Sequence, residues 1–377
     1  MGVEEFSIHV SENELKDLKR RLSSARIPKN VERKNWNFGT NAEYLAEVIN
    51  YWKNSYDWRN IEQKLNGFHH FQTTISNIRI HYIHEKGKSA NSIPIILTHG
   101  WPDSFLRYTK LIPLLTDPEK FGVSSGISFD VVIPSLPGFG FSDYPAGGSI
   151  NNDTISDIWL ELMKNKLGYD RFLAAGGDIG SGVTRYLGFK YPQNLIGIHL
   201  TDVGIIRDLL NQSQLQSFSS EEQEYCKVAS DWLDKEAGYM KIQSTKPQTL
   251  AFGLTDSPVG LAAWILEKFH SWRDLQTNLP LDDIITNIMI YWFGENIYTA
   301  TRVYYENSHF LNPIGTIEVP TGICLFPKDI LLPPRKWVEA HLNVVHWGNA
   351  KKGGHFTSME NPEEYAADLF LFLNKLR

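Results

Sequence analysis

The sequence predicts an α/β protein whose mostly parallel sheet of about eight strands is covered by helices on both faces. Short apolar runs without alternation predict its central strands, because strands buried on both faces read as continuous apolar segments. Helix-like segments separate these runs, and strand–helix–strand repeats are typical of a doubly wound sheet. The expected strands cover roughly Ile93–Thr98, Phe129–Pro134, Arg171–Gly176, Leu195–Leu200, Thr321–Phe326 and Leu342–Trp347.

The chain before these strands, residues 1–92, predicts a helical meander that leads into a hairpin. Ser11 followed by Glu14 indicates a capping box that opens a helix over Glu14–Ser23. A second helix is expected over Asn41–Trp52. Alternating residues at Phe71–Ile75 and Ile78–His84 predict the hairpin. The first 70 or so residues contain too few apolar side chains for a core of their own, so we expect them to pack on the rest of the chain.

Between Leu200 and Pro320 the strand signal disappears, and a helical, aromatic pattern replaces it. A helical insertion after a sheet strand predicts a lid over the carboxyl edge of the sheet, where open α/β sheets bind ligands. We therefore divide the rest of the chain into a first core part (93–202), a lid (203–318) and a second core part (319–377). The expected lid helices are Glu221–Glu236, Ser257–Trp272, Leu281–Phe293 and Thr299–Tyr305.

Composition excludes several classes of protein. The net charge of −6 gives no basic face for nucleic acid. The two cysteines, Cys226 and Cys324, form no metal-ligand or redox pattern, so we expect no disulfide framework and no metal. No apolar run has the length of a membrane helix, and the N-terminus lacks a signal peptide's pattern. We expect a cytoplasmic protein without a membrane anchor, and the oligomeric state stays open, with a homodimer as one option.

The main chemical signal is Gly176-Gly177-Asp178-Ile179-Gly180, which follows a predicted strand and precedes a predicted helix. This is the context of a nucleophile elbow, a sharp turn that usually carries Ser. A carboxylate at this turn forms an alkyl ester, so its targets are electrophilic carbons such as those of epoxides or haloalkanes. An Asp before a helix is also a common N-cap, but a cap has no need for the two flanking glycines.

The base and the acid of such a site are expected late in the chain, each after a strand. His355 lies in Gly353-Gly354-His355-Phe356, between the last predicted strand and the last helix. Asp329 follows the preceding strand and would accept the imidazole N–H of His355. A turn residue beside Pro327 is the competing interpretation of Asp329.

The hydrogen-bond donors that stabilise the oxyanion are expected directly after the first central strand, in His99-Gly100-Trp101-Pro102. The backbone N–H groups of Trp101 and Ile179 would hold a developing oxyanion. We expect His99 to support the loop. In the lid, Tyr239 and Tyr304 offer phenols that can donate a proton to an epoxide oxygen as its C–O bond breaks. Haloalkane cleavage would need N–H donors for the halide, and Ile179 rather than Trp follows Asp178.

These motifs together resemble the microsomal-type epoxide hydrolases, a branch of the α/β-hydrolase superfamily, and the resemblance covers most of the chain. It implies an α/β-hydrolase fold and no cofactor. The motifs that carry it are His99-Gly100-Trp101-Pro102, Gly177-Asp178, Gly238-Tyr239, Asp256-Ser257-Pro258-Val259-Gly260-Leu261-Ala262-Ala263, Arg302-Val303-Tyr304-Tyr305-Glu306-Asn307 and Gly353-Gly354-His355-Phe356.

The resemblance assigns each residue a role. Asp178 matches the nucleophile, His355 the water-activating base and Asp329 the acid position, which is Glu in some members. Tyr239 and Tyr304 match the two proton-donating tyrosines, with Tyr305 as a neighbouring alternative for the second. The resemblance implies a small-molecule epoxide and water as substrates and a vicinal diol as product.

The sequence departs from the family at two places. The family usually has Trp after the nucleophile, whereas Ile179 stands here, which predicts a wider pocket wall. Eukaryotic members often begin with a membrane anchor, which is not expected here. Two alternatives stay open: a haloalkane dehalogenase-like hydrolase, and a non-catalytic ligand receptor on the same fold.

Overall fold

The apolar runs of the sequence become neighbouring strands of one sheet, and most of them keep their expected bounds. The computed structural model describes residues 2–29, 31, 33–122, 126–145, 147–203 and 218–377. Its strands are β1 (Glu4–Phe6), β2 (His70–Ile75), β3 (Ile78–Glu85), β4 (Ile93–Thr98), β5 (Phe129–Pro134), β6 (Phe172–Gly176), β7 (Leu195–Leu200), β8 (Ile317–Leu325) and β9 (Leu342–Asn349).

The strands that the structure describes form a mixed sheet in the order β1-β2-β3-β5-β4-β6-β7-β8-β9. From β5 to β9 every neighbouring pair is parallel, whereas β1, β2, β3 and β5 pair antiparallel. The α/β class with a mostly parallel sheet is therefore confirmed. The expected number of strands was one too few, because the sheet has nine. The additional strand, β1, has three residues and a largely exposed surface, so it leaves no apolar run to detect.

Helices connect these strands and form the lid. They are α1 (Glu12–Ser23), α2 (Ala42–Asn54), α3 (Trp58–Leu65), α4 (Leu111–Thr116), α5 (Asn152–Leu160), α6 (Ile179–Lys190), α8 (Ser220–Lys235), α9 (Gly238–Gln243), α10 (Pro247–Asp256), α11 (Pro258–Trp272), α12 (Leu281–Phe293), α13 (Ile297–Phe310), α14 (Arg335–Glu339), α15 (Thr357–Glu360) and α16 (Pro362–Lys375). Shorter segments are the 3-10 helices η1 (Phe105–Tyr108), η2 (Pro118–Phe121) and η4 (Pro192–Asn194) and the π-helix η3 (Glu161–Lys166).

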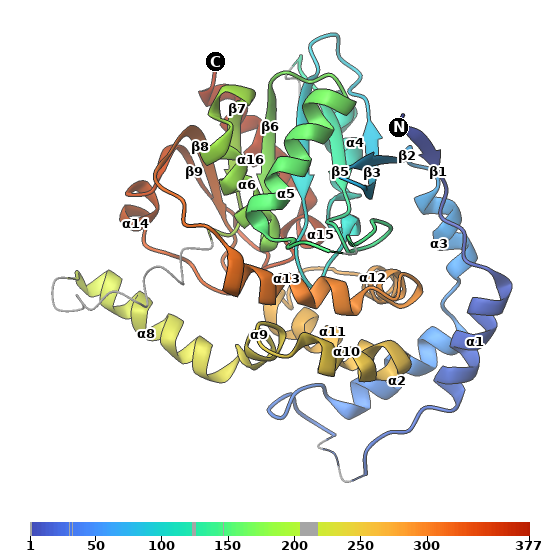
Figure 1. The fold of residues 1–377 in the computed structure, drawn as a ribbon. Coiled ribbons are helices and arrows are strands. Elements are labelled where there is room, and N and C mark those ends of the chain that lie inside the picture. The colour runs from blue at the N-terminus through green and yellow to red at the C-terminus, as the bar shows by residue number, and fades with distance from the viewer. Residues whose placement is uncertain (1, 30, 32, 123–125, 146, 204–217) are drawn as a thin grey trace.

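The sheet has helices on both faces (Figure 1). Helix α6 packs on β4, β6, β7 and β8 and also against α5, whereas α16 packs on β8 and β9 and against α4. Because the central strands are covered on both faces, their residues are almost all buried; β5 and β6 are buried along their whole length. This burial is why those strands read as continuous apolar runs.

The lid helices lie across the end of the sheet at which the parallel strands finish (Figure 1). The expected helices correspond to α8, α11, α12 and α13, while α9 and α10 were not expected. Residues 204–217, which belong to the expected lid, lie outside the described residues. Nothing in the fold tests the expected domain bounds, which stay predictions.

The N-terminal meander packs on the rest of the chain, as the sequence predicted, and part of that contact is made with the lid. Helices α1 and α2 contact α11. The Thr40 hydroxyl donates to the Ala263 carbonyl at 2.6 Å, and the Tyr51 hydroxyl donates to Asp282 at 2.7 Å. The capping box at Ser11 is present, although its helix begins at Glu12. The meander therefore fixes the outer side of the lid.

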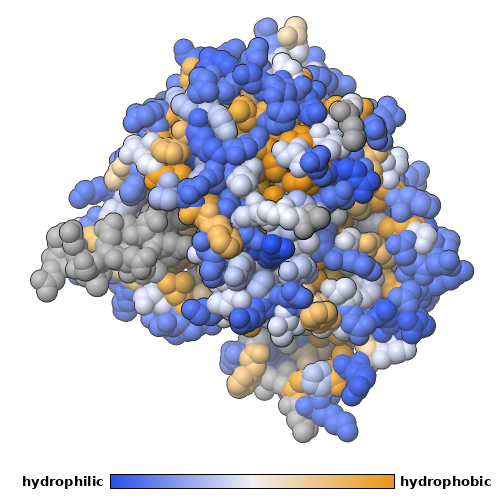
Figure 2. Space-filling model, in the orientation of Figure 1, coloured by the Kyte–Doolittle hydropathy of each residue, from blue (hydrophilic) through white to orange (hydrophobic). Residues whose placement is uncertain are grey.

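The face in Figure 2 is largely hydrophilic, with apolar side chains in small separate groups. Across the described ranges no single helix has the length and hydropathy needed to cross a membrane; α10 and α11 pass that test only as a pair, and a bend of 118° separates them.

Candidate active site

The turn between β6 and α6 has the backbone of a strained elbow. Asp178 has φ 55° and ψ −128°, a backbone conformation that residues other than glycine rarely adopt. The turn is also too crowded for side chains at its flanks: a Cβ on Gly176 would lie 2.3 Å from the Gly180 carbonyl oxygen, and one on Gly180 would lie 1.9 Å from the Thr98 carbonyl oxygen. The glycines are therefore sterically required.

Asp178 does not act as a helix cap. It occupies the N-cap position of α6, yet its side chain makes no capping hydrogen bond. Its Oδ1 instead accepts the backbone N–H of Trp101 at 2.8 Å. The side chain is 13% exposed, so the carboxylate is not sealed from the space under the lid. The alternative interpretation of Asp178 as a plain cap is wrong.

The Trp101 donor lies on the loop after β4, where the sequence placed it. The Trp101–Pro102 peptide is cis. A Cβ on Gly100 would lie 2.3 Å from Asp178 Oδ1, so only glycine lets this loop approach the elbow. His99 is fully buried, and its Nε2 accepts the Leu136 N–H at 3.1 Å, which confirms a supporting role.

The second predicted donor, Ile179, is the first residue of α6 and is buried. Of the backbone N–H groups in the described residues, the one seen to donate to the Asp178 carboxylate belongs to Trp101. The contribution of the Ile179 N–H stays a prediction, which rests on its place at the N-terminus of the helix.

The structure brings His355 and Asp329 together behind Asp178. His355 follows β9 and Asp329 follows β8, and parallel strands end at one edge of the sheet. The distance from His355 Nδ1 to Asp329 Oδ1 is 2.7 Å, and that from His355 Nε2 to Asp178 Oδ2 is 3.4 Å. Asp329 also accepts the Ile330 N–H at 2.7 Å, so the turn and the histidine share this carboxylate.

Electrostatics at His355 are dominated by these two carboxylates. The imidazole is buried, and burial alone would lower its pKa. The negative charges of Asp329 and Asp178, together with their hydrogen bonds, outweigh burial and raise the pKa of His355 to about 10. In the resting site the imidazole therefore carries a proton at neutral pH.

The two lid tyrosines pack around Trp101, whose backbone N–H binds the Asp178 carboxylate. Tyr239 comes from α9 and stacks on the Trp101 indole with ring centroids 5.2 Å apart. Tyr304 comes from α13 and meets the Trp101 and Tyr239 rings edge-on, each at 5.9 Å. Burial, the Asp178 carboxylate and Tyr239 raise the pKa of Tyr304 well above its usual range, so it keeps its proton.

Tyr305, the alternative to Tyr304, turns elsewhere. Its ring stacks on His309 with centroids 4.0 Å apart. The placement of the two neighbours therefore favours Tyr304 as the member of the pair that faces Asp178.

Three charged residues near the site, Arg107, Asp103 and Lys268, were not among the residues predicted from the sequence. Arg107, only 1% exposed, forms an ion pair with Asp103 and donates to the His355 carbonyl at 2.6 Å. Asp103 accepts the Gly100 N–H at 2.8 Å, so the ion pair joins the Trp101 loop to the His355 loop. Burial opposes the Asp103 charge, but Arg107 and His99 together outweigh it and hold the pKa of this carboxyl below its usual range. The signal was an Asp and an Arg four residues apart beside the predicted oxyanion loop.

The third of these residues, Lys268, lies in the mostly apolar helix α11 and is buried. Its ammonium lies 4.6 Å from the centroid of the Tyr239 ring and 5.4 Å from that of Trp272. It also forms an ion pair with Glu267. A buried cation over an aromatic face is favourable, so Lys268 helps to hold Tyr239 in place.

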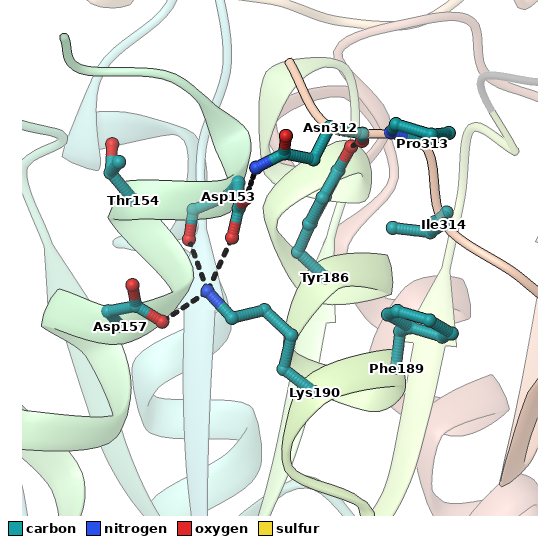
Figure 3. A pocket seen from close by; sticks show the side chains of 9 residues that line it. All are labelled: Asp153, Thr154, Asp157, Tyr186, Phe189, Lys190, Asn312, Pro313 and Ile314. Carbon is teal, nitrogen blue, oxygen red and sulfur yellow. Dashed lines mark hydrogen bonds and ion pairs between the residues drawn. The ribbon is translucent and has the colours of Figure 1, made fainter. Parts of the chain in front are cut away.

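A surface pocket of about 320 Å³ lies apart from these residues, between α5, α6 and the chain after α13 (Figure 3). The Lys190 ammonium bonds to both Asp153 and Asp157 there, so its charge is already neutralised. Lys190 ends α6, and a rise of ~1.5 Å per residue puts it about 16 Å along the helix from the elbow. Within the described residues, no cluster of three or more His, Cys, Asp or Glu side chains is arranged to hold a metal ion.

Comparisons with known proteins match the sequence and the fold of this chain. Residues 3–108 match the family described as epoxide hydrolase N terminus, and residues 93–314 match the α/β hydrolase fold family. Epoxide hydrolase 1 of Sus scrofa is 35% identical over an alignment that covers 100% of this chain and 89% of that protein.

Solved structures agree with these matches. The juvenile hormone epoxide hydrolase of Bombyx mori superposes with a TM-score of 0.90 at 29% identity, covering 100% of this chain and 95% of that one. The Aspergillus niger epoxide hydrolase gives a TM-score of 0.88 at 30% identity, covering 100% and 97% of the two chains.

Proposed function

Because this chain belongs to the epoxide hydrolase family of the α/β-hydrolase fold, we propose that it converts epoxides to vicinal diols through an ester formed on Asp178. The observation that carries the proposal is the environment of the Asp178 carboxylate. One oxygen accepts the Trp101 N–H, and the other lies 3.4 Å from the His355 imidazole. Nucleophile, oxyanion donor and base thus converge on one carboxyl group.

The first step is attack on an epoxide carbon by Asp178 Oδ2, because Oδ1 is already engaged by Trp101. The new bond joins Oδ2 to carbon, and the C–O bond of the epoxide breaks. The departing oxygen is basic and needs a proton. Tyr304 and Tyr239 supply it, and the raised pKa of Tyr304 supports this role, since that phenol is protonated before reaction.

The second step is hydrolysis of the ester. His355 takes a proton from water, and the hydroxide attacks the Asp178 carboxyl carbon while Asp329 stabilises the imidazolium. The N–H groups of Trp101 and Ile179 hold the oxyanion of the tetrahedral intermediate. Collapse of the intermediate breaks its bond to the diol oxygen, which takes the proton from the His355 imidazolium as the diol leaves. The proton that remains on the Asp178 carboxyl group then passes to His355, which restores the carboxylate. The two steps need different groups. Asp178 is the nucleophile of the first step, and His355 is the separate base that activates water in the second.

Esterification also prepares His355 for its role. The Asp178 charge is one of the two that raise the pKa of His355. An ester is neutral, so its formation removes that charge and lowers the pKa of the imidazole. The imidazolium then releases its proton, which restores the tyrosine phenol that donated in the first step, and the neutral histidine can act as a base when water must be activated.

The decisive experiment is to trap the ester. The His355→Gln variant should alkylate Asp178 but not release the diol, so intact-mass measurement with styrene oxide should find an adduct that maps to Asp178. His69→Gln is a matched control, because His69 also pairs with a carboxylate, Glu85, but is exposed. An adduct on another residue, or normal turnover by His355→Gln, would refute the proposed mechanism.

The same assay separates the alternatives. A haloalkane dehalogenase would release chloride from 1-chlorobutane and form no diol from styrene oxide. A ligand receptor would form no adduct at all. The two tyrosines that face Asp178 favour the epoxide, because a phenol can protonate an alkoxide whereas a halide needs no proton.

A further inference from the structure

The backbone of the His355 loop is held by a carboxylate that takes no part in the chemistry. Glu360, at the end of α15, accepts the Gly354 N–H with Oε2 at 3.1 Å and the Phe356 N–H with Oε1 at 3.0 Å. The two oxygens thus bind the residues on either side of His355. Glu360 is itself only 6% exposed, so these charge-assisted bonds are shielded from water.

The same carboxylate reaches the lid. Glu360 Oε2 also accepts the Asp274 N–H at 2.7 Å and the Thr277 hydroxyl at 3.0 Å. Asp274 and Thr277 lie in the connection between α11 and α12, directly after the lid helix that carries Trp272. One side chain therefore ties the histidine loop to the lid.

The chain around the lid connection also accepts hydrogen bonds from the histidine loop. The Asp274 carboxylate accepts the Gly353 N–H at 3.1 Å, and the Trp272 carbonyl accepts the His355 N–H at 2.8 Å. A Cβ on Gly354 would lie 2.5 Å from the Trp272 carbonyl oxygen, so glycine is required for the two segments to come this close. Asp274 is buried as well.

Four successive N–H groups of the loop, those of residues 353 to 356, therefore have acceptors in Glu360, Asp274 or the Trp272 carbonyl. Among the hydrogen bonds and ion pairs of the described residues, neither carboxylate contacts Asp178, and neither reaches the His355 ring. Their effect on the reaction must pass through the backbone of the loop. The two carboxylates also act on the lid through Trp272. The centroid of the Trp272 ring lies 5.1 Å from that of Tyr239 and 5.3 Å from that of His355.

We propose that Glu360 and Asp274 form a clamp that positions His355 for ester hydrolysis and holds the lid connection against it. The inference rests on the proposed function, because it assigns the clamp to the second step only. Asp178 and Trp101 are held by the elbow and the β4 loop instead, so alkylation does not depend on the clamp.

The test compares the two steps in single-turnover experiments with styrene oxide. Glu360→Gln keeps the shape of the side chain but replaces one acceptor oxygen by an NH₂ group, which cannot accept the loop N–H groups. We expect ester hydrolysis to slow about 10- to 100-fold, because small displacements of a catalytic group have effects of this size. Alkylation should stay within about two-fold, so the Asp178 adduct accumulates.

Glu364→Gln is the matched control. Glu364 lies at the start of α16, and it accepts the Lys351 N–H and the Asn361 side-chain amide but contacts no residue from 353 to 356. It should behave as wild type in both steps. Asp274→Asn tests the lid side of the clamp and should slow hydrolysis in the same selective way.

Equal slowing of both steps in Glu360→Gln, or unchanged hydrolysis in both Glu360→Gln and Asp274→Asn, would overturn the clamp. If Glu360→Gln fails to fold, Asp274→Asn and Glu360→Asp decide by the same ratio of the two rates. An adduct in His355→Gln with no selective effect in the clamp variants refutes the clamp alone. Absence of any Asp178 adduct in His355→Gln refutes the ester mechanism, and the clamp's role with it.

Discussion

The half of the active site that belongs to the sheet and the half that belongs to the lid are held by different forces. In the sheet half, Asp178, Asp329 and His355 follow three strands that end at the same edge, and hydrogen bonds of 2.7 and 2.8 Å fix them. In the lid half, Tyr239 and Tyr304 come from helices and are held mainly by ring packing around Trp101.

Because the two halves supply different groups, the two steps of the reaction depend on different parts of the active site. Alkylation needs the nucleophile and the lid phenols, so it depends on how the lid lies against the sheet. Hydrolysis needs the histidine, the acid and the oxyanion donor, all of which the sheet half supplies. A change at the lid tyrosines should therefore slow the first step, and a change around His355, which includes Glu360 and Asp274, should slow the second.

The largest effect is expected from removing the nucleophile, on which both halves depend. Asp178→Ala should lose diol formation by about 10⁴-fold or more, as single losses of a nucleophile do in other hydrolases. No covalent adduct should appear by intact mass with any epoxide. Full turnover by this variant would show that the reaction does not pass through an ester on Asp178.

Loss of both lid phenols should come next. The double variant Tyr239→Phe and Tyr304→Phe should lose epoxide opening by about 10²- to 10⁴-fold, the usual contribution of general-acid catalysis. Each single variant should keep partial activity, because the other phenol still reaches the oxygen. Ester hydrolysis, measured as decay of a preformed adduct, should change little.

Tyr305→Phe is the matched control for this pair. Tyr305 is the sequence neighbour of Tyr304, but its ring packs on His309 rather than on Trp101. It should alkylate at the wild-type rate. Normal epoxide opening by the double variant would place the proton source outside the lid half.

The sheet half could be predicted from the sequence more fully than the lid half. The bounds of β4, β5 and β7 were predicted to the residue, and the elbow, Asp329 and His355 followed from positions after strands. Parallel strands bring such positions together by rule. In the lid, Tyr239 and Tyr304 could be singled out from 16 tyrosines only through a family resemblance, because periodicity does not say which way a lid helix faces.

The long-range contacts of residues that act through the backbone could not be predicted from the sequence. Neither Glu360 nor Arg107 was among the expected site residues. Their contacts join segments 248 residues apart in the case of Arg107 and His355, and 86 apart for Glu360 and Asp274. Such distant pairings leave no local pattern. The short strand β1 was missed for a related reason, since its pairing with β2 is made by the backbone.

The third prediction concerns the charge that the two steps share. Neutralising Asp178 as Asn should lower the pKa of His355 from about 10, because one of the two carboxylates that stabilise the imidazolium is gone. NMR titration of the imidazole nitrogens measures this directly. The pH profile of ester hydrolysis should likewise rise through a pKa below that of the resting enzyme.

The raised pKa of His355 also makes the stability of the folded protein depend on pH. The pKa of His355 is higher in the folded protein than its ordinary value of 6.5, so the stabilisation is complete below about pH 6.5 and is lost as the pH rises through about 10. An unchanged imidazole pKa in Asp178→Asn would mean that Asp329 alone sets it. Esterification could then not prepare the base.

The smallest effect is expected at Lys268, which lies behind the lid half. Its ammonium is 4.6 Å from the centroid of the Tyr239 ring, in a buried setting where a cation over an aromatic face stabilises by about 1–2 kcal/mol. Lys268→Met should slow alkylation about 5- to 30-fold, the rate equivalent of that energy, and should leave ester hydrolysis unchanged. Lys268→Arg keeps the cation and should recover most of the rate, whereas Lys241→Met, an exposed change on the same helix as Tyr239, should have no effect. Slower hydrolysis in Lys268→Met would show that the lid half also governs the second step, because Trp272 contacts both this cation and the His355 ring.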